Sequence, residues 1–167
     1  MKIKIVGIDP GLADTGIGIV EGCNRRVDSY AFGSIKTFHK DPQPLRLEKI
    51  YTRLSALFED ESPDLIVVEE VFSLDKYPTS GIVLGKVCGV ILLAGCKAGA
   101  MIKEVAVREA KQVLTGNGNA SKAQLEKAVR NELGCQQPIR PYHASDALGL
   151  ALIGLFRYGS RGYRNRL

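Results

Sequence analysis

Three carboxylates stand at unusual positions in this sequence, each at the border of an apolar run. They are Asp9, Glu69 and Asp146. Acids at the rim of a core are costly unless something positive fills the space between them. Mg²⁺ is the usual cation for such a place, because it takes carboxylate oxygens and also binds phosphate. Together the three acids predict a divalent-metal site that acts on a phosphate-containing substrate.

Each acid also has an ordinary structural explanation when it is taken alone. Asp9-Pro10-Gly11 is a good turn sequence. Glu69 and Glu70 could be solvated residues at the end of a strand, and Asp146 could favour a helix start by interacting with the helix dipole. The joint pattern, beside a basic C-terminal half, favours the metal site over three separate coincidences.

Composition and charge narrow the class of protein. The chain has 167 residues, of which 45% are hydrophobic and 25% charged, and this is typical of one globular domain. It excludes intrinsic disorder, collagen and coiled coil for the chain as a whole. Residues 1–83 hold 10 basic and 13 acidic side chains, whereas residues 84–167 hold 13 and 5, so the net charges are −3 and +8. A basic half of this kind indicates a polyanionic partner.

Nothing in the sequence indicates export or a membrane span. The longest uncharged apolar run, 87–96, has ten residues, whereas a spanning helix needs about 20. The apolar start of the chain is broken at once by Asp9 and Pro10, so we expect no signal peptide. The four cysteines form no CxxC pair. We therefore expect a cytoplasmic protein.

The apolar periodicity predicts alternating strands and helices in an α/β fold. Strands are expected at 2–8, 15–20, 27–37, 65–68 and 101–105, and helices over 47–58, 81–98, 107–114, 121–133 and 143–158. A hairpin meander followed by crossover strands predicts a mixed five-stranded sheet with helices on both faces. Ser121 and Gln124 form a capping box at the start of one helix. We read 81–98, apolar nearly all round, as a buried helix. Residues 1–157 are expected to form one domain, and 158–167 a basic tail that we expect to be disordered.

Four short motifs connect these acids to a known family. They are GIDPG at 7–11, TG at 15–16, VEEVF at 68–72 and HASDAL at 143–148. In this order and at this spacing they resemble the RuvC family of Holliday-junction resolvases, over about residues 3–157. The resemblance implies the RNase H-like fold. It also implies a homodimeric, Mg²⁺-dependent endonuclease that resolves four-way DNA junctions by paired symmetric nicks in recombination and repair.

The resemblance assigns the chemistry to four side chains that act as catalytic residues and metal ligands. They are Asp9, Glu69, His143 and Asp146. Two Mg²⁺ ions per active site are implied, for which Mn²⁺ can substitute. Many family members have Asp where this chain has His143. A neutral imidazole favours softer metals such as Mn²⁺ and could instead orient or deprotonate the attacking water.

The resemblance also implies how the DNA and partner proteins are bound. Contacts to DNA are expected from Phe72, which would stack on an unpaired base, and from Lys76, Arg108, Lys111 and Lys122. Family members work with the RuvA-RuvB branch-migration complex. A two-fold dimer would match the symmetry of a four-way junction, and the helix over 81–98 is the expected contact between the two copies.

Two other functions have to be weighed. An actin-like nucleotide-binding protein would use Asp9 to Gly11 and Thr15-Gly16 on phosphates, but those proteins need a second, duplicated domain for which 167 residues leave no room. A non-cleaving junction-binding protein would have no need for the intact acids Asp9, Glu69 and Asp146.

Overall fold

The structure, a computed structural model, describes residues 2–71 and 78–159. These residues form five strands and five helices. The strands are β1 (Ile3–Asp9), β2 (Asp14–Cys23), β3 (Arg26–Lys36), β4 (Leu65–Glu69) and β5 (Met101–Val105); the helices are α1 (Gln43–Glu61), α2 (Pro78–Lys97), α3 (Val107–Thr115), α4 (Lys122–Glu132) and α5 (Tyr142–Tyr158). The element order is the one that the periodicity predicts.

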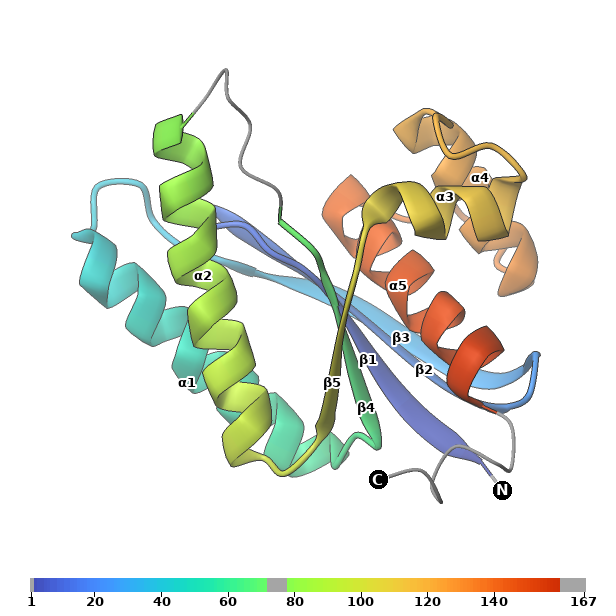
Figure 1. The fold of residues 1–167 in the computed structure, drawn as a ribbon, viewed down its shortest axis with the longest axis horizontal. Helices are drawn as coiled ribbons and strands as arrows, with labels where there is room; N and C mark the ends of the chain where they lie inside the picture. Colours follow the sequence, from blue (N-terminus) through green and yellow to red (C-terminus); the bar gives the residue numbers. More distant parts are fainter. Residues whose placement is uncertain (1, 72–77, 160–167) are drawn as a thin grey trace.

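The five strands form one mixed sheet in the order β3-β2-β1-β4-β5 (Figure 1). Strands β1, β2 and β3 are antiparallel neighbours, joined by short turns. Strands β4 and β5 run parallel to β1, because each is reached through a crossover helix. The predicted mixed five-stranded sheet is confirmed.

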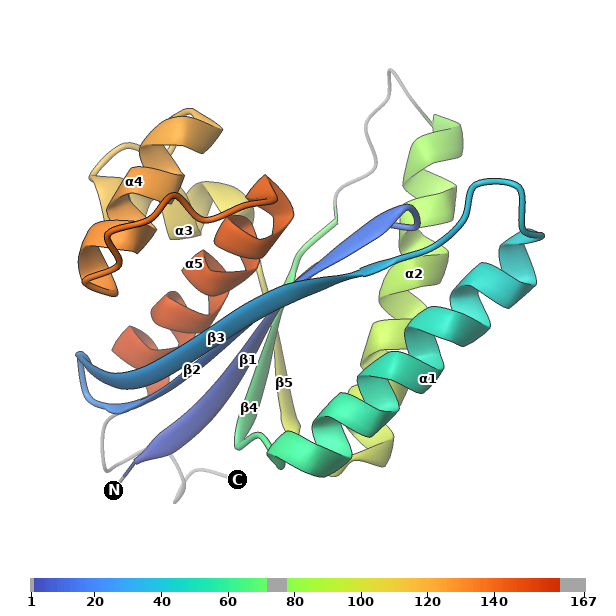
Figure 2. The same cartoon turned by 180° about the vertical axis from the view of Figure 1, so that it is seen from behind.

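Helices cover both faces of the sheet, which is therefore the middle of three layers. Helices α1 and α2 lie on one face, and α3, α4 and α5 lie on the other (Figures 1 and 2). Strand β4 shows why its sequence is a continuous apolar run: Leu65 and Val67 pack toward α5, whereas Ile66 and Val68 pack toward α1 and α2. A strand buried on both faces has no position that favours a polar side chain.

The predicted capping box at the start of α4 is confirmed. The backbone N–H of Gln124 donates to Ser121 Oγ at 3.2 Å, and the N–H of Ser121 donates to Gln124 Oε1 at 2.8 Å. Each bond satisfies a donor that a helix end leaves unpaired. The box fixes where α4 begins and so places Lys122 in its first turn.

Helix α2 differs from the sequence prediction. We expected a buried helix over 81–98, but only one side of α2 is buried. That side carries Val87, Ile91 and Ala94. The opposite side is apolar and exposed. The stretch Thr79–Lys97 is long and apolar enough to cross a membrane by length and composition alone, although 28% of it is buried against the rest of the protein. Its packing against α1 and the sheet makes it part of the folded domain.

The C-terminal end of the described chain is tied to the β2–β3 turn. Helix α5 ends at Tyr158, and the carbonyl of Gly159 accepts the N–H of Asn24 at 3.0 Å. The rest of the predicted basic tail, residues 160–167, lies outside the described residues.

Candidate active site

The predicted acids come from three elements that meet at one end of the sheet. Asp9 is the last residue of β1 and Glu69 the last of β4, and these strands are parallel neighbours. Side chains at the carboxyl ends of such strands lie at the same edge. The N-terminal part of α5 adds the remaining two side chains. We call this group the carboxylate site: Asp9, Glu69, His143 and Asp146.

Glycines in β1 and β2 allow α5 to lie directly on the sheet. A Cβ on Gly16 would be 2.1 Å from the carbonyl oxygen of His143, and one on Gly7 would be 2.0 Å from that of Ala147. A Cβ on Gly18 would be 2.4 Å from the backbone nitrogen of Leu148. The glycines of the GIDPG and TG motifs therefore determine how closely α5 approaches Asp9.

Two polar contacts hold side chains of the carboxylate site in place. His143 Nδ1 lies 2.6 Å from Oδ2 of Asp9, although the two residues are 134 positions apart in sequence. When Asp9 is ionised, the ring nitrogen donates this hydrogen bond. Lys122 Nζ forms a longer ion pair, 3.8 Å, with Oδ2 of Asp146. The other oxygen, Asp146 Oδ1, is buried without a hydrogen-bond partner among the described residues.

The carboxyl groups of the site lack enough nearby positive charge to keep them all ionised, and the pKa values of all three are raised. Burial is the main reason that the pKa of Asp9 is raised to about 6, and the charge of Asp146 raises it further. A hydrogen bond with Glu69 lowers it in part. Burial, and to a smaller extent the hydrogen bond with Asp9, raises the pKa of Glu69 to about 8. Burial also raises the pKa of Asp146. The raised pKa values therefore favour one proton held between Asp9 and Glu69.

These residues suit a divalent cation by their chemistry. Carboxylate oxygens and imidazole are ligands for Mg²⁺ and Mn²⁺, and Oδ1 of Asp146, which has no hydrogen-bond partner in residues 2–71 and 78–159, could serve as one. Among residues 2–71 and 78–159, however, no three acidic, His or Cys side chains converge closely enough to enclose one ion. The site is instead arranged in pairs, Asp9 with His143 and Asp146 with Lys122. A cation would replace the shared proton and the lysine as the source of positive charge.

We expect the metal-free protein to lose stability as the pH rises from about 4.5 to about 8. Unfolded Glu69 ionises near 4.5, while the folded protein holds that proton until about 8, so the unfolded state is favoured progressively within this range. Because one unit of pKa is worth about 1.4 kcal/mol, the interval from 4.5 to about 8 corresponds to a loss of at most about 5 kcal/mol. Thermal unfolding of the wild type and Glu69→Gln across this pH range measures it.

The matched control for this experiment is Glu70→Gln, since Glu70 is the exposed neighbour of Glu69. Its pH dependence should match that of the wild type, whereas Glu69→Gln should flatten the curve. Saturating Mg²⁺ should stabilise the wild type more at pH 8 than at pH 5. Equal pH dependence in all three proteins would contradict the assignment of the raised pKa to Glu69.

Two of the predicted DNA-binding lysines lie beside the carboxylate site. The charges of Lys122 and Lys111 both lower the pKa of Glu69 and of Asp146. Arg108 is exposed on α3 and packs against Gly118 in the loop that leads to α4. Phe72 and Lys76 lie outside the described residues.

One acid near the site has no role in the sequence analysis. Asp14 begins β2, its charge raises the pKa of Asp9, and its Oδ1 is buried without a hydrogen-bond partner in the described part of the chain. The only signal in the sequence was an acid at the start of a glycine-rich strand, which a turn explains equally well.

Comparison with known proteins identifies relatives over almost the whole chain. Residues 5–154 match the family described as crossover junction endodeoxyribonuclease RuvC. The protein of that name from Syntrophomonas wolfei is 38% identical over 156 residues, which cover 93% of this chain and 90% of the relative. The one from Salinispora arenicola is 38% identical over 162 residues, covering 95% and 91%.

Solved structures agree with the sequence relatives. RuvC from Thermus thermophilus superimposes with a TM-score of 0.80 at 30% identity, covering 92% of this chain and 94% of that one. The T. thermophilus protein in complex with a Holliday junction substrate gives a TM-score of 0.86 at 28% identity, covering 94% and 95%. The similarity thus includes a chain that was solved on DNA.

Proposed function

This chain belongs to the RuvC family of crossover junction endodeoxyribonucleases, and we propose that the carboxylate site is the centre with which it cuts DNA. The protein is a divalent-metal-dependent nuclease that resolves Holliday junctions in recombination and repair. One observation carries the assignment of the site: His143 and Asp9 make a direct 2.6 Å contact across 134 positions of sequence. A contact of this kind brings the first and last motifs of the family into one site.

The acids would divide two Mg²⁺ ions between them, and Mn²⁺ could substitute. Asp9, central on β1, would serve both ions, while Glu69 would hold one and Asp146 the other. When bound, such a pair of ions activates water and stabilises negative charge on the phosphate and on the leaving O3′. Glu69 must release its proton to become a ligand, so metal binding should be tighter at higher pH.

His143 has one ring nitrogen free for chemistry. Its Nδ1 is engaged by Asp9, which fixes the orientation of the ring and leaves Nε2 available. That atom can either ligate an ion or accept the proton of the attacking water. In both roles Asp9 holds the ring in place, so His143 depends on the acid that it contacts.

The basic residues around the site would hold the DNA backbone. Lys122 is 59% exposed and already lies beside Asp146, so it can reach a phosphate next to the reacting one. Lys111 and Arg108 extend this positive surface along α3. Contacts of this type dominate affinity for nucleic acid and weaken with salt. Phe72 remains a proposed DNA contact by family membership alone, and Lys76 remains one because of its charge.

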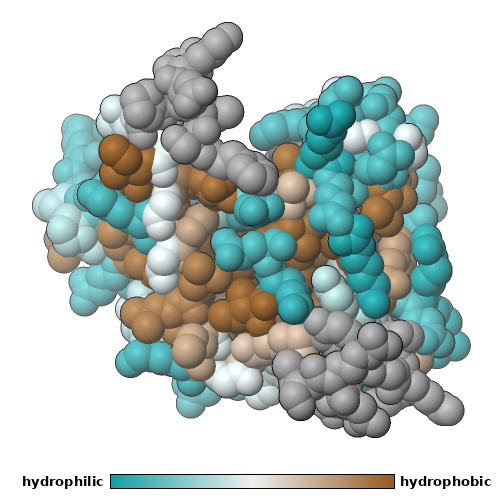
Figure 3. Space-filling model, viewed as in Figure 1, coloured by the Kyte–Doolittle hydropathy of each residue, from teal (hydrophilic) through white to brown (hydrophobic). Residues whose placement is uncertain are grey.

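The exposed side of α2 supports a homodimer. Ile82 and Leu93 are 63% and 51% exposed, and Gly85 and Gly89 have no atom within 4 Å of the position of a Cβ. Brown and pale side chains follow this helix on the surface in Figure 3. Glycines four residues apart lie on one face of a helix and allow a second helix to come close. A two-fold contact here would give two active sites for two symmetric nicks.

We expect Leu93→Glu to convert the dimer into a monomer. The substitution would place one buried charge per copy opposite its symmetry mate, which is costly at a self-complementary interface. Light scattering coupled to size exclusion measures the mass. The control is Phe38→Glu, which alters a side chain of similar exposure, 53%, in the β3–α1 loop. A Leu93→Glu protein that stays dimeric would place the interface elsewhere.

Cellular context follows from family membership. We propose that the protein acts in the cytoplasm together with the RuvA-RuvB branch-migration complex, as the family does.

The decisive experiment is cleavage of a synthetic four-way junction. We expect paired, symmetric nicks with Mg²⁺ or Mn²⁺ and binding without cleavage in EDTA. Linear duplex of the same sequence should remain uncut, because the nuclease is selective for structure. Binding without cleavage under all metal conditions would indicate a junction-binding protein and overturn the proposal.

A further inference from the structure

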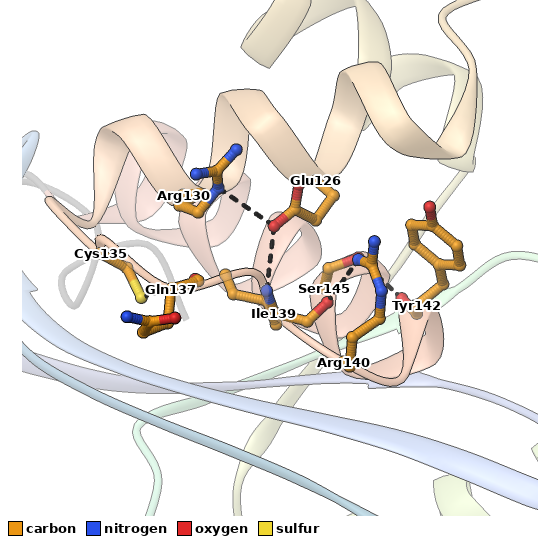
Figure 4. A network of polar contacts seen from close by, with 8 residues as sticks. All are labelled: Glu126, Arg130, Cys135, Gln137, Ile139, Arg140, Tyr142 and Ser145. Carbon is orange, nitrogen blue, oxygen red and sulfur yellow. Dashed lines mark hydrogen bonds and ion pairs between the residues drawn. The ribbon is translucent and has the colours of Figure 1, made fainter.

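A buried carboxylate on α4 binds the segment that leads into α5. Glu126 is 5% exposed, and its Oε1 accepts the backbone N–H of Ile139 at 2.9 Å. The same oxygen forms an ion pair with Arg130, at 3.2 Å. Figure 4 shows this oxygen between the α4 helix and the linker. Ile139 itself is fully buried, so this is an anchored point of the chain.

Apart from the burial of Ile139, the other contacts of the linker are local ones, of Cys135 with Arg130 and Gln137 and of Arg140 with the Ile139 carbonyl and the Tyr142 ring. Residues 135–141 form neither helix nor strand, and Pro138 and Pro141 have no N–H to donate. Helix α5 begins immediately afterwards, and Pro141 at its N-cap provides no side-chain cap. The position of the first turn of α5 therefore depends on where Ile139 is held. His143 and Asp146 lie within that first part of the helix.

We propose that Glu126 is a positioning residue for the carboxylate site. By accepting the Ile139 N–H, it holds the entry to α5 so that His143 faces Asp9 and Asp146 faces the metal position. The inference rests on the proposed function for its catalytic consequence. The glycines below α5 determine how close the helix comes to the sheet, and Glu126 determines where its N-terminal turn lies.

The chemistry of the contact indicates that the acceptor oxygen matters more than the charge. A buried carboxylate is costly even beside a guanidinium such as that of Arg130, and an apolar side chain would fill the same space. What an apolar side chain cannot do is accept the N–H of Ile139, which would then be buried without a partner. Gln keeps an acceptor oxygen at the same distance from the backbone, so it should preserve the function that Leu removes.

The test compares Glu126→Leu, Glu126→Gln and Glu132→Leu, the last being an exposed acid of the same helix. Four properties are measured on the full chain: hydrogen exchange of the Ile139 amide, Mn²⁺ affinity by titration, junction affinity in EDTA, and the single-turnover cleavage rate at saturating enzyme. Hydrogen exchange and Mn²⁺ titration report on the linker and the site even if the cleavage assay shows no activity.

We expect Glu126→Leu to speed exchange of the Ile139 amide at least tenfold and to weaken Mn²⁺ binding. Cleavage should slow about 10–100-fold. Junction affinity should change by less than about threefold. Glu126→Gln and Glu132→Leu should stay within about threefold of the wild type in all four properties. A folded Glu126→Leu protein with wild-type Mn²⁺ affinity and exchange would overturn the inference. Equal losses in the Leu and Gln variants would also overturn it, because they would assign the effect to the charge. A wild type that fails to cut junctions while these binding and exchange differences persist would refute the proposed function alone.

Discussion

We expect that replacing Asp9 with Asn will reduce junction cleavage by at least about 10³-fold and leave junction binding intact. Asp9 is the central acid of the carboxylate site. It contacts His143 and shares a proton with Glu69, and the charge of Asp146 raises its pKa. A neutral amide in its place would be a weaker ligand for a divalent cation than a carboxylate and would hold the imidazole less firmly. Binding should survive because we propose that basic residues of α3 and α4, rather than Asp9, hold the DNA backbone. Gel-shift in EDTA and cleavage in Mg²⁺ measure the two properties separately.

A matched pair of neighbouring acids serves as the control. Glu69→Gln should lose cleavage as Asp9→Asn does, whereas Glu70→Gln should retain it, because Glu69 is partly buried beside Asp9 and Glu70 is exposed. Both substitutions replace a glutamate carboxyl group with an amide of the same shape. Normal cleavage by the Asp9→Asn protein, or equal losses in the two glutamate variants, would refute the assignment of the carboxylate site.

Replacing Gly16 with Ala should damage both the fold and the active site. The added methyl would lie 2.1 Å from the carbonyl oxygen of His143, which is far inside van der Waals contact, so α5 must move away from β2. Overpacking of this kind costs about 3 kcal/mol, which lowers the melting temperature by about 6–12 °C in a chain of this size. The displacement also separates His143 from Asp9, so we expect cleavage to fall more than about 100-fold even where the protein is folded.

The control for this substitution is Gly33→Ala on the adjacent strand. A Cβ at Gly33 would meet nothing within 4 Å, so both stability and cleavage should stay close to those of the wild type. Circular dichroism melting and single-turnover cleavage below the transition measure the two effects. If Gly16→Ala melts and cleaves like Gly33→Ala, the spacing of α5 from the sheet does not control the site.

Local patterns in the sequence were sufficient for most of the fold. The apolar run 65–68 identified a strand buried on both faces, and the Ser121–Gln124 box identified the start of α4. These features are readable because periodicity and capping depend on residues within a few positions of one another. The same reasoning failed for α2, since composition alone cannot tell an apolar face packed against the sheet from one left exposed.

The motifs and their order were also enough to indicate the chemistry, because they show which acids border apolar runs and that they resemble those of a metal-dependent nuclease family. Three features could be seen only in the folded chain: Nδ1 of His143 contacts Asp9, Asp146 has an oxygen without a hydrogen-bond partner among the described residues, and Glu126 accepts the N–H of Ile139. The physical reason is that such contacts join residues far apart in the chain. Their distances depend on how closely α5 packs on β1 and β2, and no local pattern of residues records that distance.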